Sequence, residues 1–325
     1  MPLTRRLFSI SLAPALLLAG LSRLTGCGGG PEPLGDAEMA EFYAKPLPAP
    51  SGPLKVFHLG HSLVGRNMPA MLEQLAPSGH DHASQLGWGT TLKAHWEPDV
   101  EINGFEVEND HPRYRDAHDA LSEGTFDAFV MTEMVEIRAA IRYYDSAEYL
   151  HRWATHAREG NPRMRLYLYE TWHNIDDEEG WFTRLDRDLE RYWEGEILRG
   201  ALAREALDPP IHLIPAGQVL ARFTREIEAR GGVDGLREPA DLFARDDDGS
   251  QDTIHVNDLG TYLVALTHYA VLYHRSTIGL PRALRRADGR PASAPGPQAA
   301  QLMQEVVDEV VTGLPLTGVR QLARD

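Results

Sequence analysis

The 325-residue sequence has a single cysteine, Cys27, so no disulfide can form within the chain. The chain has fewer basic than acidic residues, with 32 Lys and Arg and 48 Asp and Glu, which gives a formal net charge of −16. This surplus of acid disfavours nucleic acid or an anionic membrane surface as a partner, and suits a neutral or mildly cationic substrate. The sequence shows no internal repeat, and its 42% hydrophobic content is that of a globular protein.

The amino terminus has the pattern of an export signal. Thr4-Arg5-Arg6 precedes an apolar run, Leu7–Leu21, which is too short and wrongly flanked to span a membrane stably. The twin arginine resembles a Tat signal, and Leu24-Thr25-Gly26-Cys27 resembles the lipobox of bacterial lipoproteins. We therefore expect residues 1–26 to be a Tat-like lipoprotein signal peptide. The exported chain would then be lipid-anchored through Cys27 to the bacterial cell envelope, on the periplasmic or outer-membrane side.

The composition divides the rest of the chain into three parts. Residues 27–53 are rich in glycine, proline and small residues, which predicts a tether with a short helix at Asp36–Tyr43. A folded domain is expected over residues 54–280. Residues 281–325 contain a proline-rich link and an amphipathic pattern at Gln298–Val311, which predicts a C-terminal helix packed on the domain.

Apolar strands alternate with helical patterns along the domain. The strands are expected at Lys55–Leu63, Thr125–Thr132, Met164–Tyr169 and Ile211–Ile214, and the helices at Met68–Leu75, Tyr149–Arg158, Trp181–Arg204, Gln218–Arg230 and Tyr262–Tyr273. Continuously apolar strands between helices indicate an α/β fold with a parallel sheet covered on both faces, in three layers. In such sheets ligands bind beyond the carboxyl ends of the strands. Here those ends carry polar residues: Gly60–Ser62, Thr132-Glu133, Thr171–Asn174 and Ala216-Gly217.

Two separated motifs suggest nucleophilic chemistry. Ser62 follows the first strand at a strand-to-helix turn, where its hydroxyl would be exposed beside a helix N-terminus; the alternative is that it only caps the helix. Asp252 and His255 are three residues apart on an expected loop before the apolar helix Tyr262–Tyr273, a spacing that presents a carboxylate and an imidazole on one side. Such a histidine takes the proton of a serine while the carboxylate fixes its tautomer.

Two further stretches suggest metal ligands only weakly. His80-Asp81-His82 lies on an expected polar loop with no third partner, which favours a solvated loop. The acidic run Asp246–Gly249 lacks the distal glutamate of an EF-hand calcium loop. We therefore expect neither a metal nor a cofactor.

Together, Gly-x-Ser-Leu after the first strand and Asp-x-x-His before the last apolar helix resemble the SGNH (GDSL-type) hydrolases, over about residues 55–273. The resemblance implies a flavodoxin-like sheet of about five strands. It also implies a nucleophile at Ser62, a general base at His255 and an orienting carboxylate at Asp252. The oxyanion hole would use the N–H groups of Ser62 and Gly89, with Gly87 as the alternative glycine.

The chain departs from that family pattern at two places. His61 stands where the family usually has Asp or Asn, and Thr132-Glu133 stands where it has Gly-x-Asn-Asp. The third oxyanion donor would then be Thr132 or Asn174, or would be missing, since an ionised Glu133 cannot donate a hydrogen bond. Glu133 would either bind a substrate hydroxyl or simply end a strand.

The resemblance implies a serine esterase that removes acyl groups, with O-acetyl groups of a carbohydrate as the expected substrate. Four tryptophans near the predicted rim would stack on sugar rings or belong to the core: Trp88, Trp96, Trp172 and Trp181, of which Trp172 is the expected substrate contact. An O-acyltransferase on the same fold and a catalytically silent glycan-binding lipoprotein are the alternatives. A lipase is disfavoured because no long apolar lid is evident.

Overall fold

A five-stranded parallel sheet forms the centre of the protein. The structure, a computed structural model, describes residues 30–204, 207–246 and 248–324, so the predicted signal peptide and Cys27 lie outside the described residues. The strand order is β2-β1-β3-β4-β5, with every neighbouring pair parallel. The strands are β1 (Lys55–His61), β2 (Asp81–Gly87), β3 (Ala128–Met131), β4 (Arg165–Glu170) and β5 (His212–Pro215).

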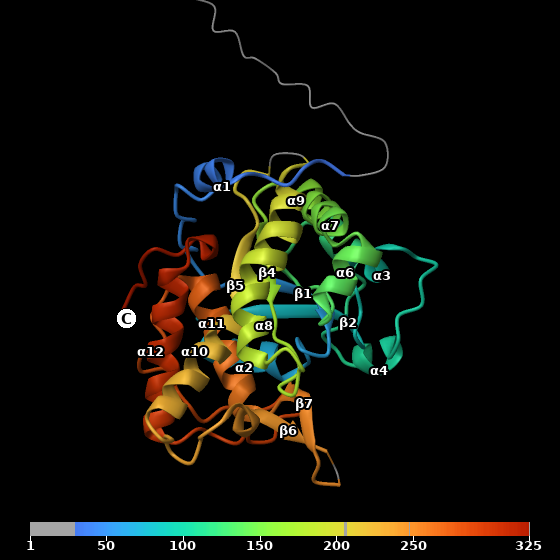
Figure 1. Cartoon of the computed structure of the whole chain (residues 1–325). Helices are drawn as coiled ribbons and strands as arrows, with labels where there is room; N and C mark the ends of the chain where they lie inside the picture. The colour runs from blue at the N-terminus through green and yellow to red at the C-terminus, as the bar shows by residue number, and fades with distance from the viewer. Residues whose placement is uncertain (1–29, 205–206, 247, 325) are drawn as a thin grey trace, which may run out of the picture.

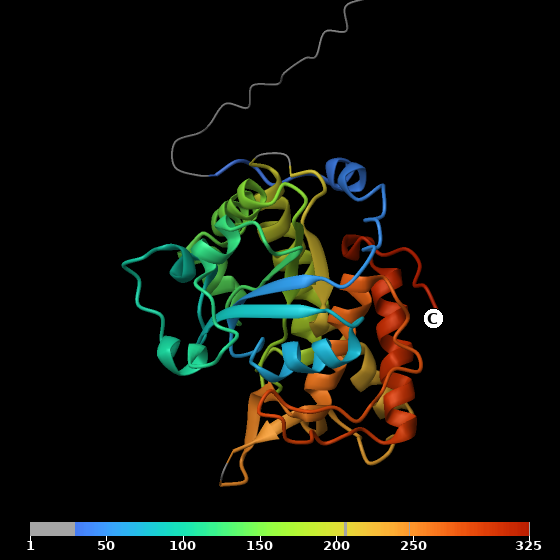
Figure 2. The same cartoon turned by 180° about the vertical axis from the view of Figure 1, so that it is seen from behind.

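Helices cover both faces of the sheet, as Figures 1 and 2 show from opposite sides. One apolar core is formed with α2 (Asn67–Leu75), α8 (Trp181–Asp188), α10 (Ala216–Ala229), α11 (Asp258–Tyr273) and α12 (Pro297–Gly313). The other is formed with α1 (Asp36–Phe42), α3 (Leu92–Trp96), α5 (Ala117–Ser122), α6 (Ile137–Tyr144), α7 (Ser146–Gly160), the π-helical segment Leu189–Leu198 and α9 (Arg199–Leu202). The central strands are buried by both layers, which is why they are apolar at consecutive positions. The predicted three-layer α/β/α fold with five parallel strands is confirmed.

Strand β2 was hidden in the sequence by its polar side chains. Residues 80–82 were expected on a solvated loop, but Asp81–Gly87 pairs along its whole length with β1. The following segment covers its outer edge, because Ser84 N–H donates to Arg113 O at 3.0 Å and Arg115 N–H donates to Ser84 O at 3.3 Å. Gln85 is satisfied inside the fold by the Ala117 N–H at 2.9 Å. The backbone of Ser84 and the side chain of Gln85 therefore have protein partners, which helps a polar segment to form a buried strand.

Part of the predicted tether packs on the domain instead. The side chains of Leu34, Met39, Tyr43 and Leu47 are buried. The Tyr43 hydroxyl donates to Ile211 O, and Leu47 N–H donates to Gly318 O at 2.9 Å. Burial of these four apolar side chains corrects the expectation that the folded body begins only at residue 54.

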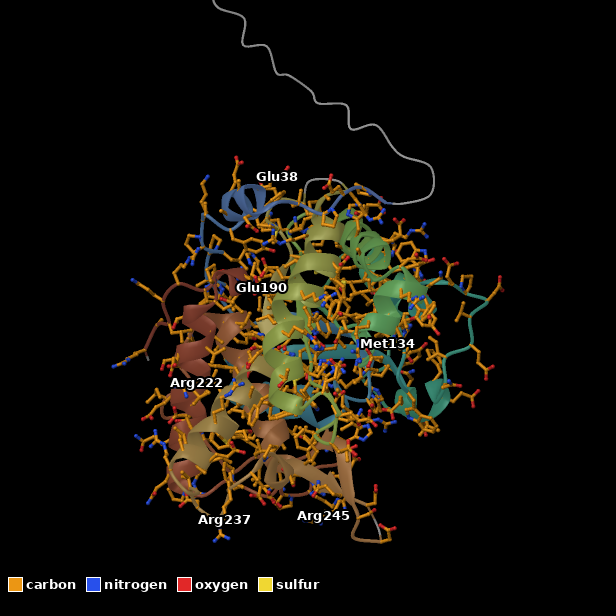
Figure 3. All side chains as sticks on the ribbon, viewed as in Figure 1. Glu38, Met134, Glu190, Arg222, Arg237 and Arg245 are labelled. Atoms are coloured by element: carbon orange, nitrogen blue, oxygen red, sulfur yellow. The ribbon has the colours of Figure 1, made fainter. Side chains whose placement is uncertain are left out.

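A small antiparallel hairpin stands at one end of the molecule, at the bottom of Figure 1. It pairs β6 (Phe243–Arg245) with β7 (Gln251–Val256) and carries Arg245, which is labelled in Figure 3. Asp252 and His255, expected on a loop, therefore lie on a strand. Immediately after it, the Asn257 side chain accepts hydrogen bonds from Leu259 N–H and Gly260 N–H and so begins α11.

The remaining elements lie around this framework. Helix α4 (Phe105–Asn109) lies at the β2 edge, where Asn109 Oδ1 accepts from Leu86 N–H at 3.0 Å. Two short 3₁₀ turns occur at Pro239–Leu242 and Pro315–Thr317. Across the described ranges, none of the helices combines the length and apolar character that crossing a membrane requires.

Candidate active site

Ser62 is the first residue after β1 and lies in a tight turn. Val64 N–H and Gly65 N–H both point back to His61 O, at 2.9 and 3.5 Å, and Gly65 adopts a positive φ of 57°. Helix α2 begins only at Asn67, with Arg66 at its N-cap position. Ser62 is therefore not the capping residue of this helix, and its hydroxyl is free for another role.

Ser62, His255 and Asp252 are brought together although 193 positions separate the serine from the histidine. Ser62 Oγ lies 3.0 Å from His255 Nε2, and His255 Nδ1 lies 2.7 Å from Asp252 Oδ2. The carboxylate accepts at Nδ1, which assigns the proton of a neutral imidazole to that nitrogen and leaves the Nε2 lone pair facing the serine hydroxyl. The arrangement is that of a serine activated by a histidine and an orienting carboxylate.

Asp252 is held as a carboxylate by its own strand. Its Oδ1 accepts from Ile254 N–H at 2.8 Å and from His255 N–H at 2.9 Å. Partial burial acts to raise the pKa of Asp252, but these two N–H groups and the imidazole outweigh it, so that the pKa lies below its ordinary value. The side chain of Asp252 is 17% exposed and that of His255 is 46% exposed, so that water reaches the imidazole.

The loop after β4 fixes strand β7. Trp172 donates its indole N–H to Ile254 O at 2.7 Å, and Ile175 N–H donates to Thr253 O at 2.9 Å. Asn174 Oδ1 accepts from the Thr253 hydroxyl at 3.0 Å. Trp172 was predicted to contact substrate, but its side chain is fully buried, and the structure makes it a support of the strand that carries His255.

His61 lies buried beneath Ser62 and joins the ends of two strands. Its Nδ1 accepts from Leu63 N–H at 3.3 Å, so Nε2 carries the proton and donates to Glu133 O at 2.9 Å. Burial lowers the pKa of His61 to about 4, although the bond to Glu133 O acts in the opposite direction. His61 is therefore a neutral link between the ends of β1 and β3.

Thr132 and Glu133 are fully buried and turned to other partners. Thr132 N–H donates to Leu59 O at 3.1 Å, and its hydroxyl lies 3.4 Å from Glu133 O, so the predicted role of Thr132 as an oxyanion donor has no support in the geometry. Glu133 Oε1 accepts from Met134 N–H and Leu92 N–H, at 2.8 and 3.3 Å. Burial raises the pKa of Glu133 to about 7, against the lowering effect of these bonds. Glu133 therefore joins the end of β3 to the start of α3.

Two backbone N–H groups remain candidates for the oxyanion hole. Within residues 30–204, 207–246 and 248–324, neither the Ser62 N–H nor the Gly89 N–H donates to a protein acceptor. Gly89 is exposed, with a φ of 55°, and follows β2 by two residues. Gly87 is buried at the end of β2, opposite His61, and a Cβ there would collide with Ile102 and Thr90. Of the two predicted glycines, Gly89 is therefore the one with an accessible N–H.

A small cavity opens beside the serine. It has a volume of about 110 Å³ and is lined by Ser62, His255, residues 63–68, Val256, Thr261 and Val264. Arg66 is one of its lining residues, and no sequence motif pointed to it. Its place four residues after Ser62, in the turn before α2, is the signal by which it could have been found.

Residues of the His80-Asp81-His82 segment have partners within the protein. His80 Nδ1 lies 2.6 Å from the Tyr273 hydroxyl, and Asp81 pairs with Arg113. No group of three or more His, Cys, Asp or Glu side chains that could hold a metal ion occurs in the part of the chain that the structure describes.

Comparison with protein-family models and with curated proteins gives no match. Among solved structures, the chain is similar to a DUF4886 family protein from Bacteroides uniformis, with a TM-score of 0.47 at 16% identity, covering 82% of this chain and 99% of that one. It is also similar to an acetyl xylan esterase, with a TM-score of 0.40 at 13% identity, covering 67% and 100%. A putative GDSL-like lipase from Parabacteroides merdae gives a TM-score of 0.37 at 13% identity, covering 68% and 96%.

Proposed function

We propose that this protein is a serine esterase that hydrolyses short acyl esters through an acyl-enzyme on Ser62. The observation that carries the proposal is the continuous path from Ser62 Oγ to His255 Nε2 at 3.0 Å and from His255 Nδ1 to Asp252 Oδ2 at 2.7 Å. A serine hydroxyl is a weak nucleophile until a base accepts its proton, and this geometry supplies both the base and its orienting group.

The reaction proceeds in two halves. Ser62 Oγ attacks the ester carbonyl while His255 Nε2 takes the hydroxyl proton, and Asp252 stabilises the imidazolium that forms. The N–H groups of Ser62 and Gly89 stabilise the oxyanion; an oxyanion donor contributes about 3–4 kcal/mol to the transition state. His255 then protonates the departing alcohol. Water, activated by the same imidazole, hydrolyses the acyl-enzyme.

The size of the cavity beside Ser62 limits the acyl group. A volume of about 110 Å³ with apolar side chains from Val256 and Val264 suits an acetyl group and not a long fatty chain. We therefore expect p-nitrophenyl acetate to be hydrolysed with a higher kcat/KM than p-nitrophenyl octanoate. A carbohydrate as the alcohol side of the ester agrees with the acid surplus of the chain, which disfavours anionic alcohols.

A labelled fluorophosphonate tests the nucleophile directly, because it reacts only with an activated serine. We expect the full chain to be labelled at Ser62, and Ser62→Ala to lose both the label and the hydrolysis of p-nitrophenyl acetate. Ser122→Ala is a matched control, because Ser122 also has a histidine nearby, with its Oγ 3.3 Å from His156 Nε2. That nitrogen donates its proton to the His118 carbonyl at 3.1 Å, so it cannot accept a proton from Ser122. Label that survives Ser62→Ala would overturn the assignment, as would loss of label in Ser122→Ala.

The export and anchoring of the chain are a separate proposal, supported by the twin arginine and the lipobox-like segment that ends at Cys27. Metabolic labelling of expressing bacteria with a palmitate analogue should mark the wild-type chain but not Cys27→Ser. Equal labelling of the two chains would contradict the anchor.

A further inference from the structure

Trp88 is an exposed indole that the fold holds rigidly. Trp88 is 51% exposed, and among the described residues it is the one tryptophan that is largely exposed. The ring lies against Gly104, whose φ of 68° and missing side chain leave room for it. The indole N–H donates to Glu108 Oε1 at 2.8 Å, and the backbone N–H donates to Asn103 O at 2.7 Å. An apolar ring fixed on one face and open on the other is prepared to stack on a ligand.

The open side of Trp88 lines a large groove, which we call the Trp88 groove. It has a volume of about 950 Å³ and is formed by residues 94–98, 100–102, 104–107, 116 and 118 together with Gln85 and Trp88. The segment from α3 to α4 that carries most of these residues projects from the β2 edge of the sheet, at the right of Figure 1 and the left of Figure 2. The groove is far larger than the cavity beside Ser62 and can hold a ligand of several rings.

The Trp88 groove begins next to Ser62, at the ends of two neighbouring strands. Gly87 pairs with His61 at the ends of β2 and β1, so Trp88 and Ser62 are the next residues of two neighbouring strands. Arg66 lines the cavity beside Ser62 and also a second hollow, which it shares with Phe105, Glu106 and Val107 of the groove. Its guanidinium donates to Val107 O and to Asp110 O, which joins the start of α2 to α4.

The acidic lining of the Trp88 groove favours uncharged ligands over anionic ones. Four carboxylates line it, and in the described part of the chain no lysine or arginine does. Glu101 and Glu106 accept no hydrogen bond from any described residue, so they are free to accept from hydroxyl groups. A ring with an apolar C–H face and outward hydroxyl donors fits an indole beside carboxylates, whereas an anionic ring is repelled.

We propose that the Trp88 groove binds uncharged sugar rings on the alcohol side of the ester, with one ring stacked on Trp88, and that it discriminates against acidic sugars. This inference rests on the proposed esterase function for its reaction, but the binding it describes can be measured without turnover. Trp88 does not contact the reacting atoms; it positions the glycan so that an acyl group reaches Ser62.

Calorimetric titration of the full-length Ser62→Ala protein tests the binding directly. The probes are acetylated cellotetraose and the same oligosaccharide carrying carboxylates at C6. We expect the neutral ligand to bind about tenfold more tightly than the acidic one, and Trp88→Ala in the same background to weaken the neutral ligand about tenfold. Trp88→Phe retains a stacking face and should recover most of the affinity. Tyr143→Ala, which removes a 62% exposed aromatic ring on α6, is the control and should change nothing.

Steady-state kinetics provide a second test of the proposal. In the active protein, Trp88→Ala should lower kcat/KM for the acetylated oligosaccharide about tenfold more than it lowers kcat/KM for p-nitrophenyl acetate, and the extra loss should come mainly from KM. Equal losses on both substrates would overturn the proposal, because the substitution would then have disturbed the catalytic residues. Neutral and acidic ligands of equal affinity, or full affinity in Trp88→Ala, would also overturn it. Failure of the wild-type chain to hydrolyse p-nitrophenyl acetate would contradict the esterase function and leave the titration to decide on the groove.

Discussion

Trp172 donates its indole N–H to the carbonyl of Ile254 at 2.7 Å, one residue before His255. The tryptophan comes from the loop after β4 and the isoleucine from the β6–β7 hairpin, so this bond helps to connect the central sheet to the strand that carries the base, together with the bonds of Ile175 and Asn174 to Thr253. The hairpin has only three residues in β6 and a shift in pairing register between Phe243 and Arg245, and by itself it would position His255 poorly. The hydrogen bond and the buried indole supply the missing rigidity.

Trp172→Phe tests this relationship. The substitution keeps an aromatic ring but leaves Ile254 O without its donor, so we expect the free energy of unfolding to fall by about 1–3 kcal/mol. It should also lower kcat for p-nitrophenyl acetate about tenfold with little change in KM, because a small displacement of the imidazole disturbs proton transfer. Trp181→Phe removes a similar buried bond, from the indole to His173 O at 3.1 Å, without touching β7. A similar fall of kcat in both variants would contradict a specific role for Trp172.

Asp252→Asn should remove most of the activity while leaving the fold intact. The amide oxygen can still accept from Ile254 N–H and His255 N–H, but the amide N–H₂ favours the imidazole tautomer that carries its proton on the wrong nitrogen. We expect kcat to fall by about 10³–10⁴-fold, measured with p-nitrophenyl acetate. Asp248→Asn, on the exposed turn of the same hairpin, should retain wild-type kcat. Because the pKa of Asp252 is held below its ordinary value, the carboxylate stays charged in assays at pH 5.

Gly60→Ala should destabilise the protein, mainly because the new methyl group would collide with Thr132. A Cβ at Gly60 would collide with the Cγ2 methyl of Thr132 and approach Val64 Cγ2 to 3.2 Å. We expect a loss of about 1–3 kcal/mol in the free energy of unfolding, measured with urea. Thr132→Ser removes that methyl, so the double variant should lose less than the sum of the single losses. If the two losses of unfolding free energy simply added in the double variant, the Thr132 methyl would not be the cause of the destabilisation.

Buried histidines should make the protein sensitive to mild acid. Burial is the largest cause that lowers the pKa of eight of them: His58 well below its ordinary value, His61, His80, His95, His268 and His274 to about 4, and His82 and His212 to about 3. Between those values and pH 6.5 the unfolded chain binds more protons than the native chain, so stability falls as the pH drops from 6.5 towards 4. Glu133 and Glu170, with pKa values raised by burial to about 7 and about 8, act in the opposite direction but are only two.

Urea unfolding at pH 7 and pH 5 measures this effect, and we expect the lower midpoint at pH 5. His58→Leu should flatten the dependence by up to about 1.4 kcal/mol per pH unit, the effect of one proton. His58 is suited to this test because its ring is fully buried and, within the described part of the chain, neither ring nitrogen has a hydrogen-bond partner. Unfolding midpoints that do not change between pH 7 and pH 5 would contradict the prediction.

Much of the fold could be predicted from hydrophobic patterns. The strands β1, β3, β4 and β5 were recognisable because strands buried on both faces are continuously apolar, and α11 because an apolar run of that length suits a buried helix. Strand β2 could not be recognised. Its residues Asp81, His82, Ser84 and Gln85 resemble a loop, and they form a strand because β1 pairs with them on one side and residues 109–117 supply partners on the other.

The candidate site, like the fold, has a part that the sequence predicts and a part that it does not. The residue types and order of Ser62, Asp252 and His255 are enough to indicate nucleophilic chemistry. Trp172, Thr132 and Glu133 are buried, although they were predicted at the substrate and oxyanion side of the site. The sequence does not show whether a polar or aromatic residue after a strand faces the solvent or the core. Only the tertiary contacts of these three residues, which are all fully buried, decided that.

The sequence by itself therefore determined the layered fold and the three residues of the proposed relay, because burial periodicity and short motifs are local properties of the chain. The tertiary structure decided the distance between Ser62 and His255, the burial of Trp172 and the exposure of Trp88. Each of these depends on contacts between segments that are far apart in sequence, and no local pattern encodes such contacts.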